Sequence, residues 1–109
     1  RIRGIQVFNH GNYNTDGLDV DGCKDVTISD CIIDAADDGI VLKSNGIQLC
    51  ENVVVTNCIV SSHCFPLKLG TETTGGFRRI SFSNIVVRPS TVTKTWGSRL
   101  PYGGIALLI

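Results

Sequence analysis

Short stretches in which apolar and polar residues alternate recur along the chain, and they predict β-strands. Residues 26–29 and 80–83 alternate strictly, and residues 53–56 form a run of β-branched side chains. Alternation with a period of two places one set of side chains on a buried face. Apolar residues do not follow helical spacing over any long stretch, and Gly, Asn, Asp and Ser fill the gaps between the runs as turn residues. The pattern therefore indicates an all-β chain.

The strand patterns repeat at a fixed step, which favours a solenoid. Residues 22–31 align with 49–58 and with 76–85, a step of 27 residues (23 to 50 to 77). A period of about 20–50 residues marks a repeat array, and short strands without helices suggest a parallel β-helix in which equivalent positions stack as ladders. We expect a polar ladder at a bend and an inward ladder beside it. Their members are Asp30, Asn57 and Asn84, and Cys31, Cys58 and Ile85 respectively.

Composition limits the class of protein. The 109 residues carry no net charge and are 42% hydrophobic, which suits one small globular unit. The absence of a basic surplus argues against a nucleic-acid binder, and no apolar run approaches the about 18 residues of a membrane span. Both ends fall within strand patterns, so we expect residues 1–109 to be about four coils of a longer β-helix, without either cap.

The five cysteines suit packing better than metal binding. No CxxC spacing occurs, so we expect no metal site. Cys23 shares a repeat position with Cys50, and Cys31 with Cys58, as expected of small apolar residues that fill the stack. A disulfide between neighbouring coils is the alternative, although strand-pair geometry does not favour it.

Titratable residues come together when residues 14–20, 37–43 and 62–68 are aligned. One column then reads Asp16, Asp38, His63, with Asp37 one position earlier. Because stacked strands lie about 4.8 Å apart, these groups should share one surface. Crowded carboxylates raise at least one pKa, and a raised acid beside an ionised carboxylate is the equipment of glycosidases.

The same alignment predicts the direction of the neighbouring side chains. It turns Leu18, Ile40 and Phe65 inward, followed by Val20, Leu42 and Leu67. Lys43 and Lys68 then share an outward column beside the acidic cluster.

Structural roles and calcium binding are alternatives to catalysis for this cluster. Asp, Asn and Gly are common at solenoid bends because they tolerate unusual backbone dihedrals. Asp-rich repeats can bind calcium, and a single histidine is more often structural. What favours catalysis is that four titratable groups gather across three coils.

In order and spacing, Asn14-Thr15-Asp16, Asp37-Asp38 and Ser62-His63 resemble the polygalacturonases, glycoside hydrolase family 28. The flanking residues 26–31 and 70–76 match as well, and the resemblance covers roughly residues 4–109. It implies a right-handed, single-stranded parallel β-helix, a secreted or periplasmic protein, and hydrolysis of pectic polysaccharide with inversion. It implies no metal or organic cofactor.

The resemblance also implies roles for individual residues. Asp37 matches the general acid that protonates the leaving oxygen, and Asp16 and Asp38 match the pair that holds and activates water. His63 matches a supporting histidine, and Asn14 a neighbouring polar contact. The acid and base carboxyls of an inverting pair should lie about 6.5–9.5 Å apart.

The chain departs from the family at two places. Cys64 follows the histidine where the family has glycine, and Ala106 and Leu108 stand where an Arg-Ile-Lys motif binds the substrate carboxylate. Lys43 and Lys68 are therefore our candidates for substrate binding. The insertion after Val87 offers further basic and aromatic residues: Arg88, Lys94, Arg99, Trp96 and Tyr102.

We accordingly expect a glycoside hydrolase whose partner is a pectic polysaccharide or oligosaccharide. One alternative is calcium-dependent β-elimination of the pectate-lyase kind, since clustered Asp residues can hold calcium. The other is a non-catalytic, glycan-binding β-helix, which the missing basic motif favours.

Overall fold

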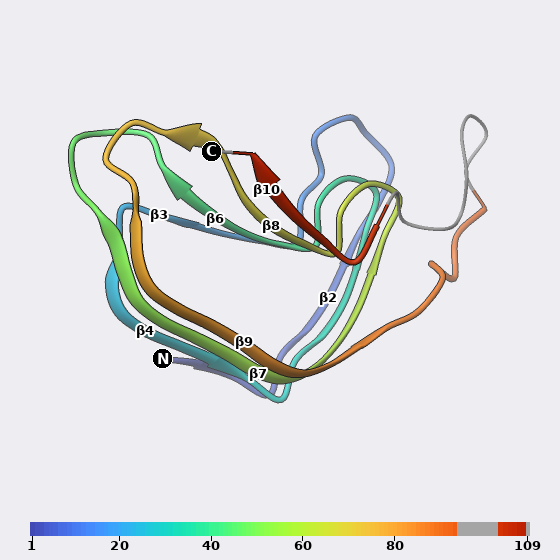
Figure 1. Ribbon diagram of the computed structural model, residues 1–109. Coiled ribbons are helices and arrows are strands. Elements are labelled where there is room, and N and C mark those ends of the chain that lie inside the picture. The colour runs from blue at the N-terminus through green and yellow to red at the C-terminus, as the bar shows by residue number, and fades with distance from the viewer. Residues whose placement is uncertain (94–102, 109) are drawn as a thin grey trace.

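The computed structural model describes residues 1–93 and 103–108, and in this part of the chain the fold is a stack of parallel strands. The strands are β1 (Ile2–Arg3), β2 (Gln6–Asn9), β3 (Leu18–Asp21), β4 (Lys24–Ser29), β5 (Ile32–Ala35), β6 (Ile40–Ser44), β7 (Cys50–Ser62), β8 (Leu67–Thr73), β9 (Phe77–Val87) and β10 (Ile105–Leu108). Seen along the stack, the coils enclose a roughly three-sided interior (Figure 1). The predicted parallel β-helix is confirmed.

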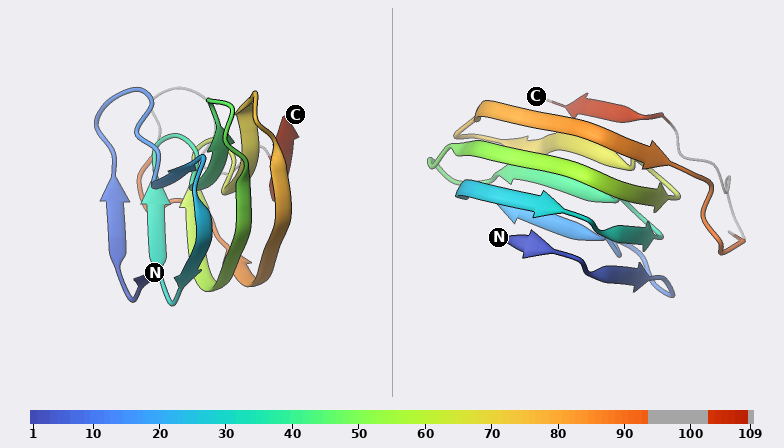
Figure 2. Two further views of the ribbon diagram at one scale, coloured as in Figure 1. Left: turned by 90° about the vertical axis from the view of Figure 1, so that its left-hand side faces the viewer. Right: turned by 90° about the horizontal axis from the view of Figure 1, so that it is seen from below.

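Every pairing between strands is parallel and joins one coil to the next. One sheet has the order β10-β8-β6-β3, and the other links β1, β4, β7, β5 and β2, with β9 paired to β7. Figure 2 shows the coils side by side from the N-terminal to the C-terminal end. The first sheet has four strand levels, and about three turns of chain connect the first level to the last.

Apolar ladders fill the interior because alternate side chains of every strand point inward. In one ladder Ile2 pairs with Ile28, Ile28 with Val55, and Val55 with Phe82. Ile28 and Val55 are fully buried. The step from the second coil to the third and fourth is the 27 residues seen in the sequence.

The predicted polar ladder lies at the sharp bend within β7 and β9. Asp30, Asn57 and Asn84 have φ angles of 58°, 54° and 53°, in the left-handed region that Asn and Asp tolerate. The Asn84 side-chain amide donates to the Asn57 side-chain oxygen, so neighbouring coils are bonded through the ladder itself. We call this corner the ladder bend.

A second ladder of the same kind was not among the sequence predictions. Asp25, Asn52 and Arg79 have φ angles of 58°, 56° and 54°. Asn52 Nδ2 donates to Asp25 Oδ1 over 2.6 Å, and Arg79 Nε donates to Asn52 Oδ1 over the same distance. Arg79, the third member, is not a typical turn residue, so the sequence does not show this column as a repeat of Asn and Asp.

The cysteines pack as predicted, with one exception. Cys31 and Cys58 are buried, and their thiols each donate to the carbonyl two residues earlier over 3.3 Å. Ile85, the third member of this inward ladder, packs against the core. Cys50 is also buried, whereas Cys23 is exposed, so the prediction that Cys23 fills the stack is wrong. All five thiols are free.

No helix within the described residues is long and apolar enough to cross a membrane.

Candidate functional site

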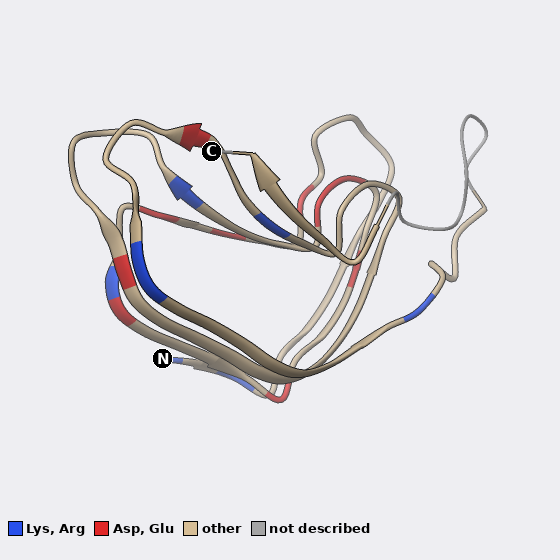
Figure 3. Cartoon of the chain, in the orientation of Figure 1, with Lys and Arg blue, Asp and Glu red and all other residues tan. Residues whose placement is uncertain are grey.

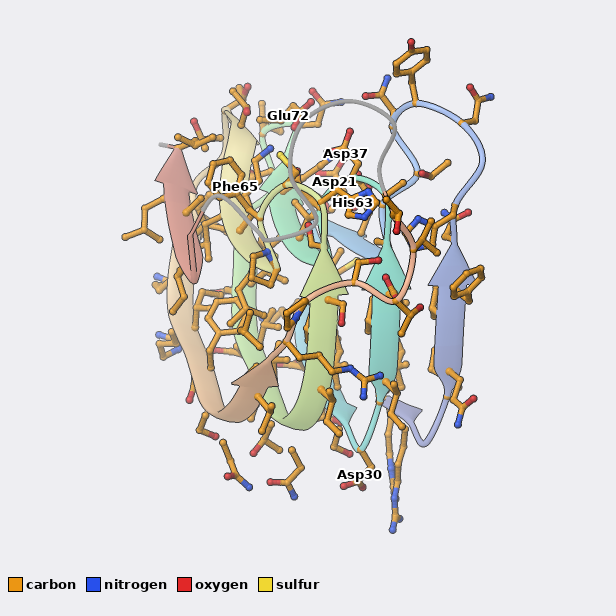
Figure 4. All side chains as sticks on the ribbon, turned by 90° about the vertical axis from the view of Figure 1, so that its right-hand side faces the viewer. Asp21, Asp30, Asp37, His63, Phe65 and Glu72 are labelled. Carbon is orange, nitrogen blue, oxygen red and sulfur yellow. The ribbon has the colours of Figure 1, made fainter. Side chains whose placement is uncertain are left out.

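The site lies at the corner where the chain leaves β2, β5 and β7 and enters β3, β6 and β8. The connections are residues 10–17 in the first coil, 36–39 in the second and 63–66 in the third, so the first is twice as long as the others. Acidic segments gather in these connections and basic segments on β6 and β8 (Figure 3). Figure 4 shows Asp37 and His63 at this corner and Asp30 at the opposite one. We call it the site bend.

Asp16 and Asp38 share a column as predicted. Leu18 pairs with Ile40, which sets the two aspartates at the same position of adjacent coils. The Asp38 backbone N–H donates to Asp16 Oδ1 over 3.2 Å, so the backbone of the second coil holds the carboxylate of the first.

Close packing of the coils explains why a glycine follows each of these aspartates. A Cβ on Gly17 would collide with the Gly39 carbonyl oxygen and with Ile33. A Cβ on Gly39 would collide with the Pro66 carbonyl oxygen and with Val60. The Asp-Gly pairs therefore combine an acidic group with a backbone that only glycine allows at this spacing.

His63 does not share the column of Asp16 and Asp38, so this part of the predicted alignment is wrong. Ala35 pairs with Ser62 and Ile40 with Leu67, which is the 27-residue step found elsewhere. Phe65 therefore takes the place next to Asp38. The His63 N–H donates to the Ala35 carbonyl and the Ala36 N–H to the Asn9 carbonyl, which sets His63 level with Ala36 and His10.

The same shift corrects two further predictions. Leu67 and Leu69, rather than Phe65 and Leu67, continue the inward ladders of Ile40 and Leu42. Lys68 stands beside Val41, whereas Lys43 stands beside Asp21, so the two lysines do not share a column. Both lysines nevertheless lie on the site side of the sheet.

Two cavities meet at the site bend. The first, of about 470 Å³, we call the acidic cavity; it is lined by Asn14, Asp16, Asp19, Asp37, Asp38, Lys43, Lys68, Thr71 and Glu72. The second, of about 400 Å³, we call the histidine cavity; it is lined by residues 10–14, Ala36, Asp37, His63, Val92 and Thr93. Asn14 and Asp37 line both cavities. All seven predicted site residues line one cavity or the other.

Asp16 has the most perturbed carboxyl group of the cluster. Burial raises its pKa to about 6, helped by the negative charge and hydrogen bond of Asp19 and by the charges of Asp38 and Asp37. The predicted rise in the pKa of one carboxyl is found at Asp16, with burial as the largest single cause and the like charges as further causes.

Asp38 is held on both of its oxygens. Lys68 Nζ donates to Oδ2 over 2.7 Å, and the Phe65 backbone N–H donates to Oδ1 over 3.1 Å. The side chains of Asp38 and Lys68 are only 5% and 14% exposed. Burial opposes the charge of Lys68, but the hydrogen bond and charge of Asp38, together with Cys64 and Asp16, raise the lysine pKa. This is a shielded ion pair between the second and third coils.

Lys43 is surrounded by carboxylates. Its ammonium lies 3.2 Å from Asp19, 3.8 Å from Asp16 and 3.9 Å from Glu72. Burial opposes its charge, yet these three neighbours together raise the pKa of Lys43. Both predicted substrate-binding lysines thus already neutralise protein carboxylates.

A network that was not predicted from the sequence holds His10, which lines the histidine cavity. The buried Asp34 accepts hydrogen bonds from His10 Nε2 (2.9 Å), Ser90 Oγ (2.6 Å), and the Thr91 backbone N–H (3.0 Å) and hydroxyl (2.7 Å). Burial opposes its charge, but these donors lower the pKa of Asp34 to about 2. The network ties residues 90–91 to the first and second coils.

His63 also lines the histidine cavity. Its Nε2 donates to the Val92 carbonyl oxygen over 2.9 Å, and its ring lies edge-on to that of His10 with centroids 5.2 Å apart. One cue in the sequence pointed to Asp34: it is a charged residue inside the apolar strand Ile32–Ala35. His10 lies in the long first connection, where no repeat partner marked it.

Asp37, Asp38 and Cys64 form the group whose donor atoms come closest to a metal-ligand arrangement among the described residues. One atom from each lies within 4.8 Å of the others. Burial, followed by the charge of Asp38, raises the pKa of the Cys64 thiol to about 12.

The residues expected at the missing basic motif lie on β10. Ala106 pairs with Lys68 and is buried, whereas Leu108 pairs with Gly70 and is exposed. Arg88 is exposed just beyond β9. Lys94, Trp96, Arg99 and Tyr102 lie outside the described residues.

Comparison with known proteins gives the family. A family model described as a right handed beta helix region matches residues 1–92. A curated probable polygalacturonase from Vitis vinifera is 30% identical over 94 residues, 78% of this chain and 19% of the relative. The chain thus spans about a fifth of that relative's length. No solved structure gives a significant match. With strands, register and family match in agreement, the chain belongs to the right-handed β-helix family.

Proposed function

We propose that this β-helix carries the active site of a glycoside hydrolase of the polygalacturonase family, family 28, acting on pectin-type polysaccharide with inversion. The observation that carries the proposal is that Asp16, Asp37 and Asp38, from two adjacent coils, line one cavity. The similarity to a probable polygalacturonase supports the choice of substrate class.

The contacts of Asp38 support a division of roles. One oxygen of Asp37 and one of Asp38 lie within 4.8 Å of each other, so these two carboxylates are close neighbours. Asp38 is also held by Lys68 and the Phe65 N–H. We therefore assign the base to Asp16, with Asp38 positioning the water.

Each proton has a defined source and destination in this reaction. Water attacks the anomeric carbon, the bond from this carbon to the glycosidic oxygen breaks, and Asp37 gives its proton to the leaving oxygen. Asp16 accepts the proton that water loses. Exchange with solvent returns a proton to Asp37 and removes one from Asp16.

The other predicted residues would position these groups or the substrate. Asn14 reaches both cavities, and His63 shapes the wall beside Asp37. Lys68 spends one of the three N–H donors of an ammonium on Asp38, so the others can serve a sugar hydroxyl.

The test is release of reducing ends from a panel of pectic polysaccharides by the full-length protein, with and without a chelator. Release that resists the chelator is the expected result. Release that needs calcium and yields an unsaturated product would identify a lyase instead. A folded protein that binds pectic chains without cleaving them would identify a glycan-binding β-helix.

A further inference from the structure

The acidic cavity is dominated by negative charge. Among its described lining residues, five carboxylates face two ammonium groups, which leaves a net charge of −3 when all are ionised and −2 when Asp37 keeps the proton that the proposed reaction requires. These groups are Asp16, Asp19, Asp37, Asp38 and Glu72, with Lys43 and Lys68. Charge of this sign repels an anionic ligand, and the repulsion grows as the ligand displaces water from the cavity.

Neither lysine offers an uncompensated positive charge. Lys68 lies 2.7 Å from the buried Asp38 carboxylate, and Lys43 lies within 3.9 Å of three carboxylates. A substrate carboxylate could reach either ammonium only by competing with a protein carboxylate. Ala106, beside Lys68, adds no charge to this column.

The lining suits hydroxyl groups instead. Carboxylates accept hydrogen bonds, the two ammonium groups donate them, and Asn14 and Thr71 can do both. An uncharged sugar ring presents a hydroxyl at almost every carbon, and each hydroxyl can donate and accept. Such a ring can satisfy these groups without bringing another negative charge.

The histidine cavity differs in this respect. Asp37 is the one carboxylate among its described lining residues, and His10 and His63 lie in its wall. The two cavities on either side of Asp37 therefore present different charges to the two sugars joined by the bond that is cleaved.

We propose that the acidic cavity holds an uncharged sugar ring, the ring whose anomeric carbon is attacked, and that it excludes a uronate from this position. This inference rests on the proposed function, because it is Asp16 and Asp38, the groups assigned to the water, that lie on this side of Asp37. It specifies the substrate further: a pectic chain cleaved after a neutral sugar.

An internal competition tests the inference. Polygalacturonate in which part of the carboxylates has been chemically reduced to alcohols offers both kinds of ring in one linkage. The attacked ring becomes the new reducing end, which borodeuteride labelling and mass spectrometry identify. We expect neutral sugars at the new ends to exceed their share in the polymer by about tenfold. New ends that match the composition, or that favour galacturonate, would overturn the inference.

Charge variants provide the matched comparison. Asp19→Asn combined with Glu72→Gln removes two charges from the cavity and should raise the share of uronate ends. Asp25→Asn removes a charge in the exposed ladder beside Asn52 and should leave this share unchanged. An unchanged share in the double variant would contradict the electrostatic cause.

A binding measurement separates this inference from the proposed function. If the polymer is not cleaved, the hydrolase assignment fails, and the affinities of the full-length protein for neutral and uronate oligosaccharides of equal length still decide the preference of the cavity. Tighter binding of the neutral oligosaccharide supports the inference, whereas equal or weaker binding, or no binding of either, overturns it.

Discussion

The ladder bend and the site bend are two corners of the same coil, and both are rich in polar residues, yet they are built differently. At the ladder bend Asp30, Asn57 and Asn84 repeat one position at a constant step and share one backbone conformation. Asn84 and Asn57 hydrogen-bond to each other, and Asp30 pairs with Arg3 in an exposed setting. These residues therefore serve the backbone conformation of the bend, and their contacts across coils are exposed.

At the site bend the polar side chains of adjacent coils are crowded together and shielded from solvent. Asp16 accepts a hydrogen bond from the Asp38 backbone, Lys68 of the third coil neutralises Asp38, and the pKa of Asp16 is raised to about 6. A repeated polar residue with its own partner indicates structure, whereas carboxylates crowded together by the fold indicate chemistry. The comparison suggests substitutions that should have opposite outcomes at the two corners.

The largest difference should appear when one substitution is made at both corners. Asp37→Asn removes the proposed proton donor, and turnover should fall by about 10²–10⁴-fold while the fold persists. Asp30→Asn places at the ladder bend the residue that Asn57 and Asn84 already provide, so turnover should stay unchanged. Initial rates of reducing-end release measure both, with circular dichroism as the check on folding. A fully active Asp37→Asn variant would remove the case for catalysis.

The second comparison concerns the ion pairs Lys68–Asp38 at the site bend and Arg3–Asp30 at the ladder bend, whose loss should change the stability of the protein by different amounts. Lys68→Gln leaves the shielded Asp38 carboxylate without its cation, and we expect the free energy of unfolding to fall by about 3 kcal/mol. Arg3→Gln breaks a 3.3 Å pair whose side chains are 60% and 47% exposed, and should cost less than about 1 kcal/mol. Urea denaturation at neutral pH gives both values. Equal losses would mean that the site bend is no more shielded than the ladder bend.

The smallest predicted effect is a gain in stability. Because the folded protein raises the pKa of Asp16 from 3.8 to about 6, the ionised carboxylate destabilises the fold above pH 6, and this penalty disappears as the pH falls toward 3.8. Asp16→Asn cannot ionise, so it should add about 1–3 kcal/mol at pH 7 and little near pH 4. Thermal unfolding at the two pH values measures the change. A loss of stability at pH 7 would show that the carboxylate supports the fold.

The fold followed from the sequence because its causes are local and repeated. The 27-residue step, the alternating strands and the polar ladder each rest on residues that recur at equivalent positions, such as Asp30, Asn57 and Asn84. Stacking identical coils brings these residues together without further information. The column of Asp16 and Asp38 was predictable for the same reason.

The parts of the site that were missed depend on contacts between unlike segments. His63 was placed two positions away from its true level because the alignment followed the order of the motifs rather than the 27-residue step. Asp34 accepts hydrogen bonds from Ser90 and Thr91, which lie 56 and 57 residues later in the sequence, and no repeated pattern predicts these contacts. The charge compensation of Lys43 and Lys68 likewise emerged only from their positions in space.

Because Lys68 of the third coil pairs with Asp38 of the second, the site can form at one position only in a stack whose other coils are alike. At the ladder bend an extra coil with Asn at the same position could continue the ladder, as Asn84 continues from Asn57. The same coil placed between the second and third would move Lys68 and His63 about 4.8 Å farther from Asp38 and Asp37. A solenoid of this kind can therefore gain or lose coils outside this group in evolution, but the coils that form the site, including the fourth, which supplies residues 90–93, must be inherited as a block.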